Sequence, residues 1–189
     1  KKRLSHIGSS GKYPKIVLGL SGGLDSTLAL LVAARACELL RIPRTTIHTI
    51  TMPATASSAR TQDNATLLAK AIGTTHEVIA IQKLVDDQLD ALGHNRKTQD
   101  ITYENTQART RTELLFNRAN QVGGIVLGTG DLSELALGWC TYNGDHMSNY
   151  AVNAGVPKTL VRYIVKAASL NEEFVSAKEV LYDILETPV

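Results

Sequence analysis

Ser21-Gly22-Gly23-Leu24-Asp25-Ser26 is the stretch on which the interpretation of this chain depends. An apolar run, Lys15 to Leu20, precedes it, and a run typical of a helix, Thr27 to Ala34, follows it. A strand, a glycine turn with hydroxyl groups and a helix N-terminus together bind phosphate well, because backbone N–H groups converge there and the helix dipole favours negative charge. The G-x-x-x-x-G-K-[ST] pattern of a Walker A loop, with its lysine, is absent.

Asp25 has two interpretations. A carboxylate beside bound phosphates is repelled unless a divalent cation such as Mg²⁺ lies between them. Alternatively, Asp25 only stabilises the first turn of the helix, as Asp does at many helix starts. The neighbouring serines and glycines favour phosphate binding by the loop as a whole.

The remaining sequence alternates between strand and helix patterns. A chain of this kind predicts an α/β fold, with a doubly wound parallel sheet, helices on both faces and ligands at the carboxyl ends of the strands. The expected strands are 15–20, 45–51, 76–81 and 124–128. The expected helices are one from Ser57 or Ser58 to Gly73, one with Leu84, Val85, Leu89 and Leu92 on its apolar side, one at 104–122, and a helical end at 157–186.

Composition predicts one domain over residues 1–189. The chain has 43% hydrophobic residues, enough for one core, and a net charge of +2, too small to indicate a nucleic-acid surface. No run is apolar enough for a membrane span. Two cysteines, Cys37 and Cys140, form neither a disulfide framework nor a metal motif, which favours the cytoplasm. Cys37 is expected in the core, and Cys140 has no neighbouring histidine–acid signature.

A polar segment, 93–101, fits neither a helix nor a strand. It is either an ordinary surface loop or a mobile flap over the site, and base rates favour the ordinary loop.

The start of the 104–122 helix carries a polar face. Asn105, Arg109 and Thr112 follow one another at helical spacing and suit a phosphate, a ribose or a carboxylate. An exposed face with an Arg109–Glu113 ion pair is the alternative, and spacing alone favours it.

The strand at 124–128 leads into Thr129, which is expected where such a sheet presents ligand contacts. Asp131 and Glu134 then have the spacing of a capping-box variant. A second carboxylate near the phosphates could equally hold a metal, and spacing does not separate the two roles.

Gly138 to Asp145 contains the only Trp of the chain, Trp139, together with Tyr142. Their rings could stack on a flat heteroaromatic group, or Trp139 could pack in the core.

These segments together resemble a known family. The hexapeptide resembles the PP-loop of ATP pyrophosphatases, which cleave ATP between its α- and β-phosphates. In order along the chain, the following segments resemble NAD synthetase: SGGLDS, Met52-Pro53 with Ser57-Ser58, Glu104-Asn105 with Gln107-Ala108-Arg109, Leu127 to Gly130 and Ser133-Glu134-Leu135. Asn153 to Leu160 resembles the glutamine-dependent branch in particular, and the resemblance runs from about Gly8 to Val189.

The resemblance implies an adenine nucleotide alpha-hydrolase-like fold, a Rossmann-like architecture, and a two-step ligase. The nicotinate carboxylate of deamido-NAD attacks the α-phosphate of ATP, and ammonia then displaces AMP to give NAD. By motif, the ATP contacts are Gly19, Leu20, Ser21, Gly22, Gly23, Leu24, Asp25, Ser26 and Thr129. The deamido-NAD contacts are Asn105, Arg109, Glu134, Trp139, Cys140, Thr141 and Tyr142, and the Mg²⁺ ligands are Asp25 and Glu134. No general base is implied.

The resemblance also implies partners. The glutaminase domain of the two-domain enzymes, which supplies ammonia from glutamine, is absent from the chain, so it resembles an excised synthetase portion that is truncated at both ends. A homodimer is implied by the family. The competing hypotheses are another PP-loop enzyme, such as GMP synthetase or a tRNA thiolase, and a non-catalytic ATP-binding module. The latter leaves the Asn105/Arg109 face and the Trp139–Tyr142 segment unexplained.

Overall fold

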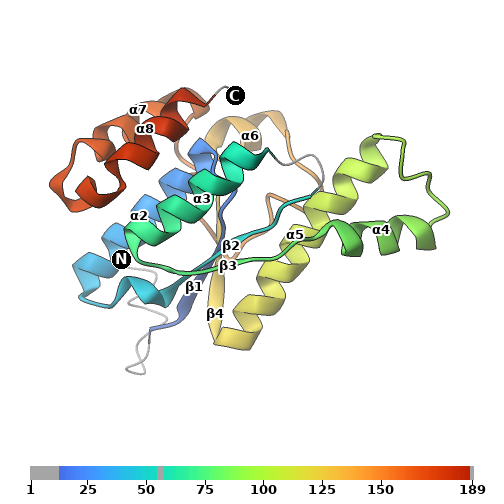
Figure 1. Ribbon diagram of the computed structural model, residues 1–189, viewed down its shortest axis with the longest axis horizontal. Helices are drawn as coiled ribbons and strands as arrows, with labels where there is room; N and C mark the ends of the chain where they lie inside the picture. The colour runs from blue at the N-terminus through green and yellow to red at the C-terminus, as the bar shows by residue number, and fades with distance from the viewer. Residues whose placement is uncertain (1–12, 55–57, 188–189) are drawn as a thin grey trace.

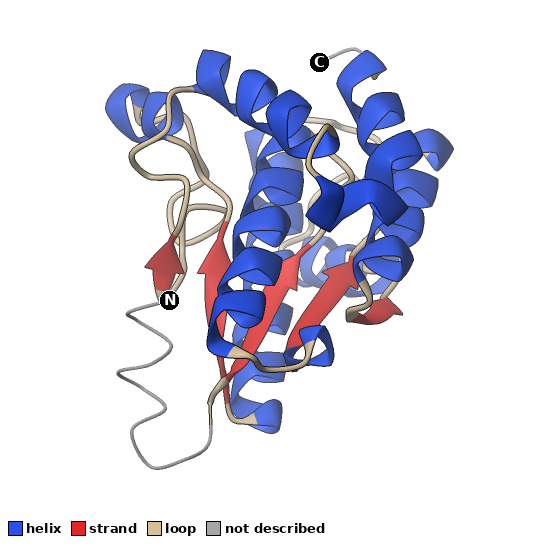
Figure 2. Ribbon diagram, turned by 90° about the vertical axis from the view of Figure 1, so that its left-hand side faces the viewer, coloured by secondary structure: helices blue, strands red, loops and turns tan. Residues whose placement is uncertain are grey.

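The apolar run Lys15–Gly19 forms strand β1, the central strand of the sheet. In the computed structural model, which describes residues 13–54 and 58–187, β1 pairs with β2 (Ile47–Thr51) on one side and β4 (Gly124–Gly128) on the other. Strand β3 (Thr75–Val78) lies beyond β2, and β5 (Tyr150–Ala151) lies beyond β4. Each pairing among these strands is parallel, so their carboxyl ends meet at one edge (Figure 2).

Alternation along β1 produces a hydrophobic core on each face of the sheet. Ile16, Leu18 and Leu20 contribute to one cluster of buried side chains, whereas Val17 contributes to the other. Both faces of β1 are therefore covered, as the continuous apolar run predicts for a parallel sheet.

Helices cover the two faces (Figure 1). The first cluster contains side chains of four α-helices and a 3-10 turn: α2 (Leu24–Leu40), α3 (Ala59–Ile72), α7 (Lys158–Ser169), α8 (Lys178–Glu186) and η2 (Glu172–Ala177). The second contains side chains of α4 (Gln82–Ala91) and α5 (Ile101–Val122). The short 3-10 turn η1 (Arg44–Thr46) precedes β2, and the short helix α6 (Leu132–Leu137) follows β4. The doubly wound architecture is confirmed.

Local signals set the helix ends. The Ser58 side chain accepts a hydrogen bond from Thr61 N at the start of α3, and Gly73 ends this helix with φ +83°. Ser57, the alternative cap, lies outside the described residues. At the start of α5, the Asp100 side chain accepts hydrogen bonds from Thr102 N and Tyr103 N. The polar segment is therefore tied to α5 through Asp100, and its Arg96 pairs with Asp90 of α4.

Some expectations were wrong in detail. On α4, Val85 and Leu89 are fully buried, but Leu84 and Leu92 are exposed, so the buried stripe is narrower than predicted. Strand β3 ends at Val78 rather than residue 81, and α5 begins three residues before Glu104. The two-residue β5 was not predicted, because so short a strand carries no periodicity.

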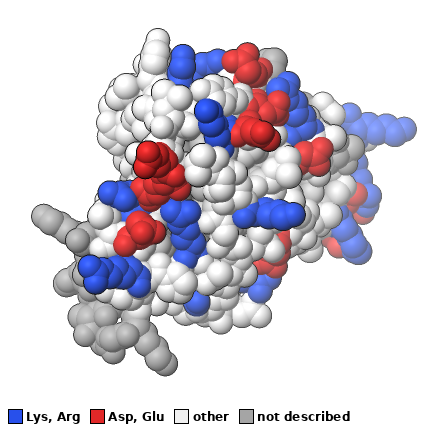
Figure 3. Space-filling model, turned by 60° about the vertical axis from the view of Figure 1, so that its left-hand side comes forward, with Lys and Arg blue, Asp and Glu red and all other residues white. Residues whose placement is uncertain are grey.

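The surface carries charges of both signs. On the face shown in Figure 3, basic and acidic side chains are interspersed. Ion pairs join helices, for example Arg35 to Glu173 at 2.9 Å and Arg60 to Asp183 at 2.6 Å. Among the described helices, none combines the length and the apolar character that a membrane span requires.

Candidate functional site

Residues 21–26 run from the turn after β1 into the first turn of α2 and are held by their own serines; we call them the phosphate loop. The hydroxyl oxygens of Ser21 and Ser26 lie 3.0 Å apart. Ser26 Oγ donates to Gly23 O at 3.1 Å, and Ser21 Oγ accepts from Gly23 N at 3.2 Å. Gly23 is the N-cap of α2 and no side chain caps this helix, so its positive dipole end is left for an anion.

Gly22 has a packing role. Its φ is +82°, and a Cβ at this position would lie 2.1 Å from the carbonyl oxygen of Thr61 in the first turn of α3. Only glycine permits both the left-handed backbone and this close approach. Gly22 therefore fixes the phosphate loop against α3 and does not itself line the cavity described next.

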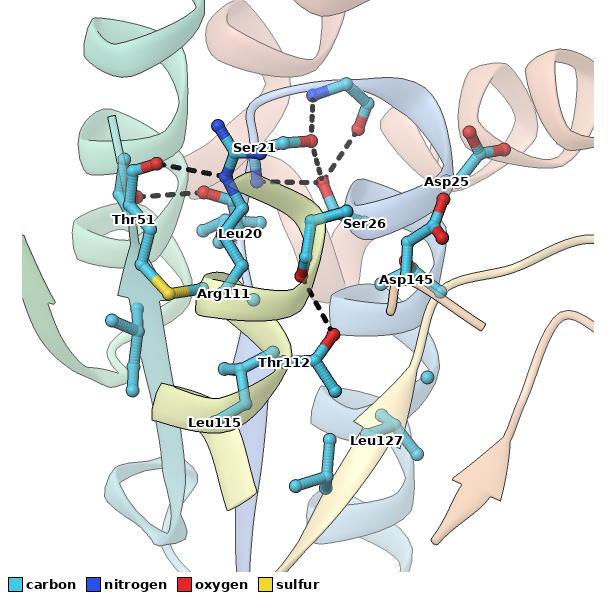
Figure 4. Close-up of a pocket in the computed structure, with 18 of the residues that line it drawn as sticks. Leu20, Ser21, Asp25, Ser26, Thr51, Arg111, Thr112, Leu115, Leu127 and Asp145 are labelled. Atoms are coloured by element: carbon cyan, nitrogen blue, oxygen red, sulfur yellow. Dashed lines mark hydrogen bonds between the residues drawn. The ribbon is translucent and has the colours of Figure 1, made fainter. Parts of the chain in front are cut away.

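A cavity of about 630 Å³ opens at the carboxyl ends of β1, β2 and β4 (Figure 4). This volume lies within the range of small-molecule sites, roughly 300–1,000 Å³. The phosphate loop contributes Ser21, Gly23, Asp25 and Ser26, and one face of α5 contributes Ala108, Arg111, Thr112 and Leu115. Gly19, Leu20, Thr51, Met52 and Thr129 complete the strand ends, and Asp145 and Met147 close another side.

Three carboxylates gather beside this cavity. One oxygen each of Asp25, Asp131 and Glu134 lies within 4.8 Å of the others. Asp131 is fully buried, and the capping box of α6 holds it in place: its Oδ1 accepts from Glu134 N at 3.0 Å, while Glu134 Oε2 accepts from Asp131 N at 3.1 Å. The capping-box prediction is confirmed, and the same geometry aligns the two acids with Asp25.

Lys158, the first residue of α7, places its ammonium among these acids. Its Nζ contacts Asp25 Oδ2 directly and lies 3.5 Å from Asp131 Oδ2 and 3.7 Å from Glu134 Oε1. Burial lowers the pKa of Lys158, but the hydrogen bond to Asp25 and the three negative charges outweigh it and raise that pKa. The pKa of Glu134 is raised, chiefly by burial and further by its acidic neighbours.

The donor set of the acidic cluster suits a hard cation. It consists of carboxylate oxygens, the ligands that Mg²⁺ prefers. Asp25 Oδ1 and Asp131 Oδ2 are buried and have no hydrogen-bond partner among the described residues. A divalent cation would satisfy oxygens that a single ammonium leaves incompletely paired.

Asn153 connects the two sides of the site. Its Nδ2 donates to the carbonyl oxygen of Asp25 at 2.9 Å and to that of Thr129 at 3.0 Å. The side chain is almost completely buried. The first turn of α2 and the residue after β4 are therefore held at a fixed separation.

The polar face of α5 meets residues 138–146, which we call the aromatic loop. Thr141 Oγ1 donates to Asn105 Oδ1 at 2.7 Å, and Arg109 Nε donates to the carbonyl oxygen of Tyr142 at 3.1 Å. Arg109 and Glu113 are exposed, as the alternative interpretation of this face had it, but its Arg109–Glu113 ion pair is absent from the described part of the chain. Asn105 and Arg109 instead position the aromatic loop.

The two aromatic residues of this loop are open to solvent. Trp139 is 79% exposed and Tyr142 is 75% exposed. The Tyr142 ring stacks on His146, with ring centroids 6.2 Å apart. Because Trp139 is outside both core clusters, core packing is excluded as its role.

Cys37 is buried in α2, as expected, whereas Cys140 is exposed. A second, small cavity of about 90 Å³ is lined by Cys140, Asp145 and His146 as well as by Asp25 and Glu134. Sequence reasoning did not anticipate that Cys140 lines a cavity together with a histidine and an acid. His146 Nδ1 is engaged by the carbonyl oxygen of Thr141 at 2.9 Å.

The structure brings most of the predicted site residues to one edge of the sheet. Of the predicted ATP contacts, all line the main cavity except Gly22 and Leu24, and Leu24 packs against the hydrophobic core. The predicted deamido-NAD contacts, apart from Glu134, lie on α5 and the aromatic loop. Sequence reasoning missed Lys158, Asn153 and Arg111 as parts of the site. Asn153 and Lys158 lie in the segment Asn153 to Leu160 that carried the resemblance, whereas Arg111 lies two residues beyond the segment that ends at Arg109.

Comparison with known proteins gives a consistent family. The sequence model of the family described as NAD synthase matches residues 3–179. A glutamine-dependent NAD(+) synthetase of Mycobacterium leprae is 50% identical over 185 residues, which cover 94% of this chain and 27% of that protein. The chain thus spans about a quarter of the length of this relative.

Two solved structures are similar. A glutamine-dependent NAD+ synthetase from Acinetobacter baumannii, in complex with adenosine diphosphate, superposes with a TM-score of 0.80 at 34% identity, covering 93% of this chain and 33% of that one. An NH3-dependent NAD synthetase from Campylobacter jejuni, in complex with the nitrate ion, gives a TM-score of 0.75 at 25% identity, covering 92% and 72%.

Proposed function

The chain belongs to the NAD synthase family, and on this premise we propose that it is the synthetase portion of an enzyme that converts deamido-NAD to NAD. A nicotinate carboxylate oxygen attacks the α-phosphorus of ATP, and pyrophosphate leaves. Ammonia then attacks the carbonyl carbon of the adenylate, AMP leaves, and one proton is released. The observation that carries the proposal is one cavity lined by the phosphate loop, including Asp25 of the acidic cluster, and by Arg111 and Thr112 of α5.

ATP is proposed to bind with its phosphates at the phosphate loop. Ser21 donates a hydroxyl hydrogen bond, Ser26 holds the loop through its own hydrogen bond to Gly23 O, and the uncapped N-terminus of α2 contributes its dipole. Thr129 completes this subsite from the end of β4. Such a reaction depends on positioning and on electrostatic stabilisation, so no side chain is assigned as a general base.

Deamido-NAD is proposed to bind over α5 and the aromatic loop. Asn105, Arg109, Thr141 and Tyr142 are already joined by hydrogen bonds, which presents them as one surface. Trp139 is available to stack on a heteroaromatic ring, and Cys140 and Glu134 line the smaller cavity between this surface and the phosphate loop.

Asp25 and Glu134, together with Asp131, are the proposed holders of Mg²⁺. When bound, this ion would neutralise charge that develops on the phosphates. The three acids fit it because they offer oxygen ligands, two of which are buried without a hydrogen-bond partner among the described residues. The ammonium of Lys158, which lies among these three carboxylates, would then share them with the ion.

The proposal extends to the longer protein. The glutamine-dependent relatives are about four times the length of the matched segment, since it covers 27% of the Mycobacterium leprae protein. We propose that a glutaminase domain of the same polypeptide supplies ammonia, that the protein forms a homo-oligomer, and that it acts in the cytoplasm.

The decisive experiment measures AMP formation from ATP and Mg²⁺ in the presence of ammonium, with and without deamido-NAD. The proposal predicts AMP and NAD in equal amounts, and only when deamido-NAD is present. Isothermal titration with each substrate provides a second measurement. A regulatory ATP-binding module would bind ATP and ignore deamido-NAD, and this outcome would overturn the proposal.

A further inference from the structure

Arg111 differs from the other cationic residues around the site. It projects from the face of α5 that lines the main cavity, and it is the only Lys or Arg among the described residues that line this cavity. In Figure 4 its side chain points from α5 toward the end of the cavity where Leu20 and Ser21 lie. A positive charge is therefore directed at the start of the phosphate loop.

Among the described residues, the Arg111 side chain has one hydrogen-bond partner. Its Nε donates to the carbonyl oxygen of Met52, just after β2, at 3.2 Å. This bond uses one of five N–H donors of a planar guanidinium and leaves the terminal nitrogens for a ligand. The bond to Met52 thus fixes the direction of the side chain and leaves the N–H groups of the two terminal nitrogens able to donate to a ligand.

The guanidinium of Arg111 forms no ion pair within the described part of the chain. No carboxylate there lies within 4.0 Å of its guanidinium, in contrast to Arg118 on the same helix, which pairs with Glu77 at 2.7 Å. Burial lowers the pKa of Arg111, and the charge of Asp145 only partly opposes this effect. A partly desolvated guanidinium without a partner is unfavourable until an anion arrives.

The phosphate loop itself has no cation. A Walker A loop carries a lysine that reaches the phosphates, and residues 21–26 contain none. From these observations we propose that Arg111 is a phosphate-binding residue: its terminal nitrogens bind phosphate oxygens of the nucleotide, supplying from α5 the charge that the loop lacks. This inference rests on the proposed function of the same cavity.

The fork of a guanidinium matches phosphate oxygens better than a carbonyl or a ring does, because it can donate two parallel hydrogen bonds. Arg111→Met removes the charge and keeps much of the apolar stem. Arg111→Lys keeps the charge but loses both the fork and the Nε anchor. Arg118→Met is the matched control, since it removes a guanidinium from the same helix outside the cavity.

The test is titration of the 189-residue chain, with Mg²⁺ in the buffer, using ATP, AMP, pyrophosphate and adenosine as probes. Loss of charge-assisted hydrogen bonds predicts that Arg111→Met weakens ATP binding on the order of 10- to 100-fold. The affinity of Arg111→Met for adenosine should stay unchanged. The ATP affinity of Arg111→Lys should fall between those of Arg111→Met and the unchanged chain. AMP and pyrophosphate separate a contact with the α-phosphate from one with the terminal phosphates, and weakening of either supports the proposal.

Thermal melting without ligand distinguishes this role from a structural one. Removing a partly desolvated charge that forms no ion pair should leave the melting temperature of Arg111→Met equal to that of the unchanged chain or higher, while the stabilisation by ATP becomes smaller. Unchanged ATP affinity in Arg111→Met, or equal weakening of ATP and adenosine, would overturn this inference alone. Failure of the unchanged chain to bind ATP would overturn it together with the proposed function.

Discussion

Asp25 shows how one side chain of the phosphate loop can serve binding more than folding. It lies in the first turn of α2, but the N-cap is Gly23 and Asp25 makes no capping hydrogen bond. Its carboxylate is directed instead to Lys158, with Asp131 and Glu134 beside it. The structure thus favours a role in the acidic cluster over the helix-start interpretation.

We therefore expect Asp25→Asn to abolish ATP turnover in the full-length enzyme while the melting temperature changes little. The amide keeps the size of the side chain but removes the charge that would hold Mg²⁺. Asp87→Asn, which affects an exposed ion pair with Lys83, serves as the control and should leave turnover unchanged. A large loss of stability in Asp25→Asn, with turnover retained in the folded fraction, would restore the helix-start interpretation.

Trp139 offers a second substitution at the residue scale. Because its ring is exposed and outside the core, Trp139→Ala should leave the melting temperature unchanged and weaken deamido-NAD binding more than ATP binding. Loss of one stacked ring costs roughly 1–3 kcal/mol by analogy with base–aromatic stacking. Tyr163 is also an exposed aromatic residue but lies on α7, away from the aromatic loop, so Tyr163→Ala is the control. Calorimetric titration with each ligand gives the comparison. Equal weakening for both ligands would contradict this role.

At the scale of elements, strands β2 and β3 carry two histidines whose pKa values are lowered, chiefly by burial: His48 and His76. The Nδ1 of His76 lies 3.0 Å from Thr49 Oγ1, and its Nε2 is buried without a hydrogen-bond partner among the described residues. Protonation of His76 would therefore leave a buried N–H group at Nε2 without a hydrogen-bond acceptor among the described residues.

This arrangement predicts acid sensitivity of the β2–β3 pair. As the pH falls through about 6.5, the unfolded chain takes up protons on these histidines that the folded chain resists, so the free energy of unfolding decreases. The decrease ends only when the pH passes the lower pKa values of the folded state. Urea unfolding between pH 8 and pH 5 should show this slope, and His76→Gln should reduce it. An unchanged slope in the variant would assign the acid sensitivity to other groups.

The elements also show which parts of the fold can be read from sequence. The caps at Ser58 and Gly73 and the capping box of α6 follow from local patterns, because each depends on residues within one or two turns. The parallel sheet follows from the alternation of strand and helix patterns along the chain. Leu84 was predicted on the apolar side of its helix but is exposed. Helical spacing predicts which side of a helix is apolar, but not how wide a stripe of that side the rest of the protein covers.

The same reasoning explains what was found and missed at the site. A glycine turn between a strand and a helix identifies the phosphate loop from adjacent residues. By contrast, Lys158 is 133 positions from Asp25, and Arg111 is 59 positions from Met52, so their contacts depend on how distant segments pack. No local pattern encodes such a distance.

At the scale of the whole molecule, the source of nitrogen is the main prediction. We expect NAD formation by this 189-residue chain to require free ammonia and to ignore glutamine, because the chain corresponds to only 27% of its Mycobacterium leprae relative. The measurement supplies ATP, Mg²⁺ and deamido-NAD with either ammonium or glutamine and quantifies NAD and AMP. Since Cys140 shares a cavity with His146 and Asp145, Cys140→Ser is included. NAD made from glutamine, and lost in that variant, would contradict the prediction.

Strand β1 pairs with β2, which precedes residues 92–100 in the sequence, and with β4, which follows them, so the sheet joins two separate parts of the chain. The largely exposed segment 92–100 divides the chain into an earlier part that carries the phosphate loop and a later part that carries α5, Asp131, Glu134 and Lys158. Neither part encloses the cavity alone. A single cut in this segment would turn the molecule into a two-component complex, whose association ATP would strengthen by mass action. The nucleotide would then act as the dimeriser of a split protein, and reassembly of the halves would serve as a sensor of its concentration.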